Sequence, residues 1–271
     1  MEFFSALFEY RFLQHAVLAC LLASIGCGVI GSFVVVKRIS FLTGGIAHSV
    51  LAGMGIAYFL SASPLLGAIL SALLAGLLIG WISLRHHEQE DVLIAAFWSC
   101  GMAIGILFLS QTPGYNVDLM SYLFGNILLI TGADLVLMLV LDLLVIAISF
   151  VFYKQLLASV FDEEFARLRG INTRFFYLLL LCLISLSVVL LIQLVGVIMV
   201  IALLTLPAAI ANQYVASLHK MFALATLICL VLSLTGLAIA YTPDLPTGSV
   251  IVLLTCVTYF ASIMLKPAGK G

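Results

Sequence analysis

The amino-acid sequence predicts an all-α fold, a polytopic integral membrane bundle of about nine transmembrane helices. Three observations carry this prediction: the 271-residue chain has a mean hydropathy of +1.31, 65% of its residues are hydrophobic, and only 8% are charged. In a soluble domain roughly a quarter of the residues are charged, so this chain has too few charged residues to cover a surface that faces water. Its net charge of -1 also provides no basic patch for phosphates, and we expect no nucleic-acid partner.

Each crossing of a hydrocarbon core about 30 Å thick needs about 20 helical residues. Cutting the apolar stretches at charges, prolines and turn clusters predicts nine spans, which are 13–36, 43–60, 65–84, 92–110, 133–153, 174–193, 196–214, 221–241 and 248–265. Only Leu194 and Val195 separate the sixth span from the seventh, so eight crossings is the alternative count. We expect residues 1–271 to form one transmembrane domain without a second globular unit.

The distribution of cations predicts the orientation of the chain, because lysine and arginine collect in cytoplasmic loops. With nine alternating spans, the loops after the odd-numbered spans and the C-terminus hold ten of the eleven lysines and arginines, and only Arg11 lies on the other side. The N-terminus is therefore expected outside and the C-terminus in the cytoplasm.

Two loops are long enough to carry structure of their own. The outer segment 110–134 is too polar to span the membrane, and its centre, 119–129, is expected to form a short half-buried helix that dips back into the protein. The cytoplasmic segment 154–174 is expected to carry a short surface helix.

The residues of this cytoplasmic helix follow the known preferences of helix ends. Ser159 or Asp162 can cap it, acidic residues lie early, basic residues lie late, and a glycine closes it. Its early acids are Glu163 and Glu164, its late bases are Arg167 and Arg169, its closing residue is Gly170, and its apolar face is Phe161, Phe165 and Leu168.

A few ionisable or polar residues lie where a transport pathway could use them. An ionisable group within a span usually faces a bundle interior or a pathway, and this applies to His48 and Asp142, although a neutral core histidine and a structural hydrogen bond are the alternative interpretations. Asp118 and Asn126 would share one face of a helical outer segment, or be solvated in a loop. Asp134 either joins the same pathway or caps its helix. The sequence therefore indicates these five residues as candidates for lining a transport pathway.

Backbone and motif signals complete the description. Pro207 lacks a backbone donor and is expected to kink the span 196–214. The chain has no GxxxxGK[ST], no HExxH and no GxSxG, which excludes P-loop nucleotide binding and removes the two commonest hydrolase signatures. We therefore expect no enzyme activity, and any transport must be driven by an ion gradient or by a partner.

Four segments, in order, carry a family resemblance: GSFVVVKRISFLTGGIAHSVLAG at 31–53, NVDLMSYLFGN at 116–126, FDEEFARLRGINTRFFYLLL at 161–180 and VGVIMVIALLTLPAAIANQY at 195–214. Together they resemble the permease subunits of bacterial ABC importers for zinc, manganese and related divalent metals. The segment VDLMSYLFG is particularly similar to the zinc-uptake members.

This resemblance implies a set of partners. It implies a cytoplasmic ABC ATPase that binds ATP, an extracytoplasmic metal-binding protein, and a second permease copy, most simply as a homodimer. The ATPase would dock on a coupling helix, which the resemblance places on Phe161, Asp162, Glu163, Glu164, Phe165, Arg167, Leu168 and Gly170. The location implied is the bacterial cytoplasmic (inner) membrane.

The resemblance also implies the cargo and the mechanism. The cargo would be a divalent transition metal, zinc first and manganese or iron as alternatives, moved by alternating access without a permanently bound cofactor. Relatives often carry Asp four residues before the histidine that matches His48, whereas this chain has Gly44. Some zinc-type relatives have Asp where this chain has Asn126. The alternative function is a proton-coupled secondary metal transporter that depends on Asp142, and a membrane scaffold without transport activity is the third.

Overall fold

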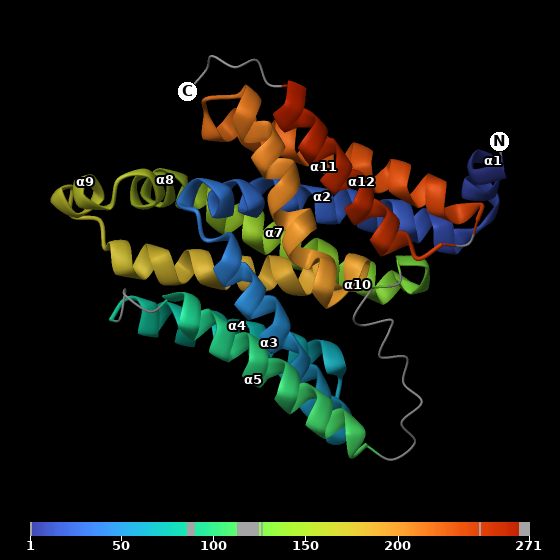
Figure 1. Ribbon diagram of the computed structural model, residues 1–271, viewed down its shortest axis with the longest axis horizontal. Helices are drawn as coiled ribbons and strands as arrows, with labels where there is room; N and C mark the ends of the chain where they lie inside the picture. The colour runs from blue at the N-terminus through green and yellow to red at the C-terminus, as the bar shows by residue number, and fades with distance from the viewer. Residues whose placement is uncertain (1, 86–89, 113–124, 126, 244, 266–271) are drawn as a thin grey trace.

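The computed structural model describes residues 2–85, 90–112, 125, 127–243 and 245–265, and every regular element within these ranges is a helix (Figure 1). In chain order these helices are α1 (Glu2–Glu9), α2 (Arg11–Lys37), α3 (Ser40–Phe59), α4 (Pro64–Ser83), α5 (Glu90–Ser110), the 3-10 helix η2 (Ile127–Leu129), α7 (Gly132–Val151), α8 (Tyr153–Phe161), α9 (Glu163–Leu168), α10 (Thr173–Tyr214), α11 (Leu218–Tyr241) and α12 (Thr247–Leu265).

Eight helices in the described part of the chain are long and apolar enough to cross a membrane. The outer faces of these helices carry large apolar side chains, among them Leu70, Leu107, Leu143 and Leu253, each more than half exposed. A soluble monomer rarely exposes so much contiguous apolar surface. The chain is therefore a multi-pass membrane protein, as its composition predicts.

The difference between eight and nine spans lies within α10. Its backbone leaves the helical conformation at Gly196, with φ 76° and ψ 169°, so α10 consists of two helices joined at a break. The first part, Thr173–Ile192, has the length of a span, and the second part is the shorter apolar helix Met199–Tyr214. The break lies directly after Leu194 and Val195, where the sequence predicts the division between the sixth and the seventh segment. Among the described residues, the number of helices long enough to span matches the alternative count of eight rather than nine. The helix continues through Pro207.

The helix α10 occupies the middle of the bundle, where it packs against α2, α3, α4, α7, α11 and α12. On one side of it lie α3, α4 and α5, which pack on one another, and on the other side lie α2, α7 and α11 (Figure 1). In Figure 1, α9 projects beyond the left ends of α7 and α10, with α8 beside it, while α1 lies at the right. We call these two ends of the bundle the α9 end and the α1 end.

The described end of the predicted outer segment packs against the break in α10. Gly125 has φ 72°, and a Cβ on it would lie 2.5 Å from the Gly196 nitrogen and 2.7 Å from the Leu194 oxygen. Ile127 is fully buried, and the carbonyl oxygen of Ile130 lies 3.2 Å from Nδ1 of the His15 ring. The rest of this segment, with Asp118 and Asn126, lies outside the described residues.

We expect Gly196→Ala to lower the stability of the folded bundle. The φ and ψ of Gly196 fall in a region that is essentially restricted to glycine, where another residue costs on the order of 1–3 kcal/mol. The matched control is Gly132→Ala, because a Cβ on this helical glycine has His15 Cε1 as its nearest atom, at 3.9 Å. Thermal unfolding in detergent should show a lower midpoint for Gly196→Ala alone, and equal midpoints for both variants would contradict this account of the break.

Candidate functional site

His48 lies in α3 with 4% of its surface exposed, and its ring stacks on the indole of Trp98 in α5. The two ring centroids are 3.9 Å apart and the planes differ by 15°. The ring nitrogen Nδ1 is buried and has no hydrogen-bond partner among the described residues. Buried polar atoms nearly always have a partner, and each exception needs an explanation. A nitrogen held in this way is available to a ligand that enters the bundle.

Small residues bring three helices together around this imidazole. At Gly101 of α5, a Cβ would lie 2.5 Å from the Ser49 Cα atom and 3.0 Å from the His48 carbonyl oxygen. At Gly44, one turn before His48, a Cβ would lie 2.7 Å from Ile201 Cδ1 in the second part of α10 and 3.0 Å from the Trp98 ring. An aspartate at position 44 would therefore require these neighbours to move, and the chain offers the imidazole without an adjacent carboxylate.

Asp142, the second predicted group within a span, lies in α7 with 2% of its surface exposed. Both carboxyl oxygens are buried without a hydrogen-bond partner in the part of the chain that the structure describes. The carboxyl group packs against α2, where a Cβ on Gly26 would lie 2.8 Å from Oδ1. The structural hydrogen bond that was the alternative interpretation of Asp142 is therefore not present among these residues.

The structure does not bring the predicted pathway residues together. His48 lies between α3 and α5 and Asp142 lies between α7 and α2, on opposite sides of α10 (Figure 1). Over the described ranges, no three His, Cys, Asp or Glu side chains are grouped closely enough to hold a metal ion. The arrangement offers isolated buried groups, each of which could contact a passing ion.

Asp134 takes part in a capping box at the start of α7. The Thr131 N–H donates to its Oδ2 at 2.9 Å, and the Asp134 N–H donates to the Thr131 hydroxyl oxygen at 3.3 Å. This reciprocal arrangement satisfies two backbone donors at a helix start. The sequence allows Asp134 to line a pathway or to cap its helix, and these hydrogen bonds show that it caps the helix.

At the α9 end, a sharp turn divides the predicted surface helix into α8 and α9. Asp162 has extended backbone between them, and its carboxylate accepts a hydrogen bond from the Phe165 N–H at 2.9 Å. Of the two predicted caps, Asp162 is therefore the one that caps α9. Gly170, with φ 76°, follows the helix, and its N–H donates to the Arg167 carbonyl at 2.9 Å.

A network of polar contacts ties α9 to α2 and α10. Glu163 pairs with Arg167 at 2.5 Å and with Lys37, the last residue of α2, at 3.7 Å. The hydroxyl of Thr173, the first residue of α10, donates to Glu163 at 3.3 Å and accepts from Arg167 Nε at 3.2 Å. Lys37 also donates to the Ser159 carbonyl in α8 at 3.2 Å. The network therefore links α9 to the ends of two long helices.

The charges around Glu163 determine its titration. Partial burial raises its pKa, but the hydrogen bond from Arg167 and the positive charges of Lys37 and Arg167 outweigh burial and lower the pKa below the ordinary value of 4.5. A carboxyl group with a lowered pKa adds stability above its ordinary pKa, and this stability is lost as the pH falls through the lowered value.

We expect Glu163→Gln to loosen α9 at neutral pH. The effect on unfolding should be less than about 1 kcal/mol because the pairs are partly exposed, so hydrogen exchange of the α9 amides is the sensitive measurement. Exchange should be faster than in the wild type at pH 7, and the difference should disappear as the pH falls below the lowered pKa of Glu163. Glu164→Gln, on the exposed side of α9, is the control. The network has no such role if both variants exchange at the wild-type rate at pH 7.

The outer face of α9 and the last residue of α8 are exposed in the described part of the chain. Phe161 is 60% exposed and Leu168 is 88% exposed, whereas Ala166 on the inner face is fully buried. Phe165 is also exposed, with the Arg169 guanidinium 5.0 Å from its ring centroid. Three large apolar side chains thus project from the α9 end of the bundle, as the sequence predicts.

Sequence reasoning did not identify two of these contacts. The ring of Trp98 lies on His48, although the two residues are 50 positions apart in different helices. Lys37 pairs with Glu163 from the far end of another helix. The only signal for the second contact was the presence of opposite charges at helix ends on the same predicted side, and nothing in the sequence indicated the first.

Comparison with known proteins identifies the family that has this architecture. The model of the ABC 3 transport family matches residues 9–266. An uncharacterized membrane protein of Synechocystis is 42% identical over 95% of this chain and 92% of its own length. The manganese transport system membrane protein MntC of Halalkalibacterium halodurans is 34% identical over 98% of this chain and 91% of its own length.

A solved structure supports the same assignment. PsaBC from Streptococcus pneumoniae, solved in complex with a Fab, matches with a TM-score of 0.89 and 32% identity, covering 98% of this chain and 96% of that chain. The family match extends from α1 to the last described residues, and the fold agrees over the same length. The chain therefore belongs to the ABC 3 transport family, as one of its permeases.

Proposed function

We propose that this chain is the transmembrane subunit of an ATP-driven importer of divalent transition-metal ions. The observation that carries the proposal is the buried His48 ring, whose Nδ1 has no hydrogen-bond partner among the described residues of a family permease. Neutral imidazole is the commonest side-chain metal ligand and suits transition metals such as zinc and iron. A permease that offers such a nitrogen inside its helices has the chemistry to contact these ions.

The sparse ligands suit transport rather than storage. An ion must bind well enough to enter and weakly enough to leave, and within the described ranges no group of three His, Cys, Asp or Glu side chains forms a tight site at His48. The name of MntC supports manganese as the cargo, whereas the segment VDLMSYLFG favours zinc. We propose one of these two ions, with iron as the alternative.

The energy would come from a separate cytoplasmic ATPase. The exposed apolar face of α9 suits a groove in another protein, and the network around Glu163 would pass its movement to α2 and α10. We propose that this movement alternates the access of the His48 region between the two sides of the membrane. The α9 end then faces the cytoplasm, in agreement with the lysines and arginines that gather there.

The remaining partners follow from the same proposal. A second copy of the chain would complete the pathway as a homodimer in the bacterial cytoplasmic (inner) membrane. An extracytoplasmic metal-binding protein would deliver the ion at the α1 end.

The experiment that tests this function is uptake of labelled manganese and zinc into proteoliposomes that contain the chain with its ATPase. We expect uptake that requires ATP and does not require a pH gradient. The preferred cargo is the ion that, when added unlabelled in excess, competes more strongly with uptake of the labelled ion.

A proton-coupled carrier remains the second candidate because one observation favours it. Asp142 is a buried carboxyl group without a hydrogen-bond partner in the described structure, and such groups occur in proton relays. That candidate requires uptake by the chain alone under a pH gradient, and it requires Asp142→Asn to abolish this uptake. Neither result is expected from a permease that depends on an ATPase.

A further inference from the structure

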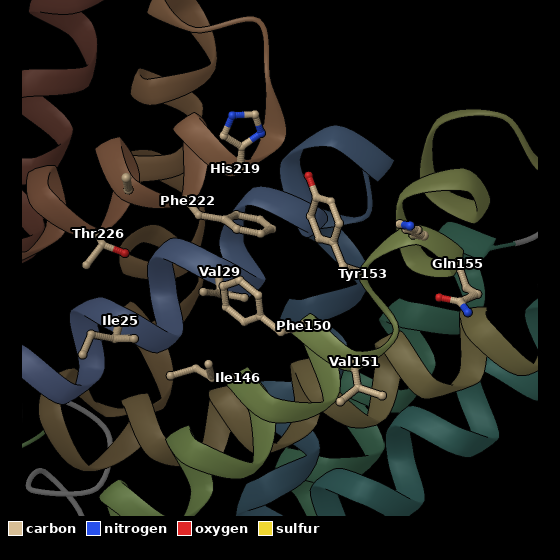
Figure 2. A pocket seen from close by; sticks show the side chains of 12 residues that line it. Ile25, Val29, Ile146, Phe150, Val151, Tyr153, Gln155, His219, Phe222 and Thr226 are labelled. Atoms are coloured by element: carbon tan, nitrogen blue, oxygen red, sulfur yellow. The ribbon is translucent and has the colours of Figure 1, made fainter.

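A cleft opens at the α9 end of the bundle, between α2, α7, α11 and the start of α8 (Figure 2). Its volume is about 830 Å³, within the range of about 300–1,000 Å³ typical of small-molecule sites. Its inner part is lined by aliphatic and aromatic side chains, including Ile25, Val29 and Ile146. Phe150 and Val151, at its edge, are more than half exposed on the outer face of α7, so the cleft opens to the surroundings of the bundle.

The rim of this cleft is polar and cationic, in contrast to its apolar inner part. Tyr153, Lys154 and His219 line it where α8 and α11 begin, and Figure 2 shows Tyr153 and His219 on the same side of the cleft, away from Ile25. Lys154 and His219 are exposed, and neither makes an ion pair or hydrogen bond to another described residue. The apolar part and the cationic rim are thus separated along one cleft.

A carboxylate close to this rim does not neutralise it. An adjoining cleft of about 520 Å³ is lined by Lys154 and His219 and also by Asp162. The Asp162 carboxylate accepts the Phe165 N–H as the cap of α9, and it makes no ion pair with Lys154. The cation of Lys154 is therefore available to an anion from outside the chain.

We propose that this cleft binds an anionic phospholipid, with an acyl chain between α2, α7 and α11 and the phosphate at Lys154 and His219. The helix ends place the rim at the level of the lipid headgroups, where tyrosine side chains such as Tyr153 are also favoured. Basic pockets between transmembrane helices are a recognised mode of binding acidic lipid headgroups. This site depends only on the chain spanning a membrane, and it is independent of the proposed cargo and ATPase.

Native mass spectrometry of the purified chain tests the proposal, with added phosphatidylglycerol or phosphatidylcholine as the probe. We expect phosphatidylglycerol to bind in preference to phosphatidylcholine, and Lys154→Gln to lower its affinity by about fivefold, the effect of one lysine near an anionic surface. The matched control is Lys220→Gln, because Lys220 is an exposed lysine next to His219 that does not line the cleft. This control should retain the wild-type affinity.

A second variant tests the apolar part of the cleft. Ala223 lines it from α11, and Ala223→Trp should fill it and weaken binding of both lipids, while its thermal unfolding midpoint reports whether the chain still folds. Equal losses for Lys154→Gln and Lys220→Gln would overturn the proposal. Complete competition by inorganic phosphate would also overturn it. If Ala223→Trp dissociates a dimer without any change in bound lipid, the occupant of the cleft is a second copy of the chain, and the proposal is overturned as well.

Discussion

His48→Ala should reduce ATP-driven metal uptake by at least about tenfold while the chain remains folded. Loss of residues that merely orient metal ligands costs 10–100-fold in affinity or activity, and His48 is proposed to be a ligand itself. The ring is buried and stacked on Trp98 and keeps Nδ1 free of protein partners among the described residues. Uptake of labelled metal by the reconstituted complex is the measurement, at a metal concentration below half-saturation.

Two further variants separate ligand chemistry from packing. His48→Gln keeps a side chain of similar size on Trp98 but lacks the imidazole, so it should lose uptake while the midpoint of thermal unfolding stays close to that of the wild type. Ser49→Ala is the control, because the Ser49 hydroxyl already donates to the Gly45 carbonyl at 2.7 Å. Normal uptake by His48→Gln and His48→Ala would remove His48 from the pathway and leave the permease assignment intact.

A second large effect is expected from the exposed face of α9. Phe165→Glu combined with Leu168→Glu should abolish binding of the ATPase and ATP-driven uptake. Buried apolar anchors at the centre of an interface contribute about 2–4 kcal/mol each, which corresponds to about 30- to 1,000-fold in affinity. Both side chains project from the bundle, so this variant should not disturb the packing of the chain.

Co-purification of the ATPase with a tagged permease measures this effect. Phe8→Glu is the matched control, since Phe8 is an exposed aromatic residue, 85% accessible, in α1 at the other end of the bundle. It should retain the ATPase. If the double variant co-purifies with the ATPase as well as the wild type does, α9 is not the docking element.

Helix positions follow from the sequence because each depends on local signals. The apolar stretches, the cap at Asp162 and the glycine after α9 are all readable from neighbouring residues, and the structure confirms them. The break at Gly196 was also visible as the boundary between two apolar stretches, although the conformation that makes it possible was not. Local chemistry therefore specified most of the elements of this fold.

Contacts between helices could not be predicted in the same way. His48 and Asp142 were both recognised as buried ionisable groups, but their separation on opposite sides of α10 depends on how the helices pack. The pairing of Lys37 with Glu163 depends on the ends of α2 and α9 meeting in space. Lys37 and Glu163 are more than 100 positions apart in the chain, and no periodic pattern in one sequence specifies such a contact.

The central claim is that an ATPase drives this permease through α9 from the cytoplasmic side, and crosslinking from α9 tests it most directly. A cysteine at position 168 lies at the most exposed apolar residue of α9, and Leu168→Cys can be treated in inside-out and right-side-out vesicles with an impermeant bifunctional maleimide reagent. We predict a crosslink to the ATPase in inside-out vesicles only, and none from the matching Phe8→Cys variant. Labelling of position 168 only in right-side-out vesicles, without any crosslink to the ATPase, would contradict the account.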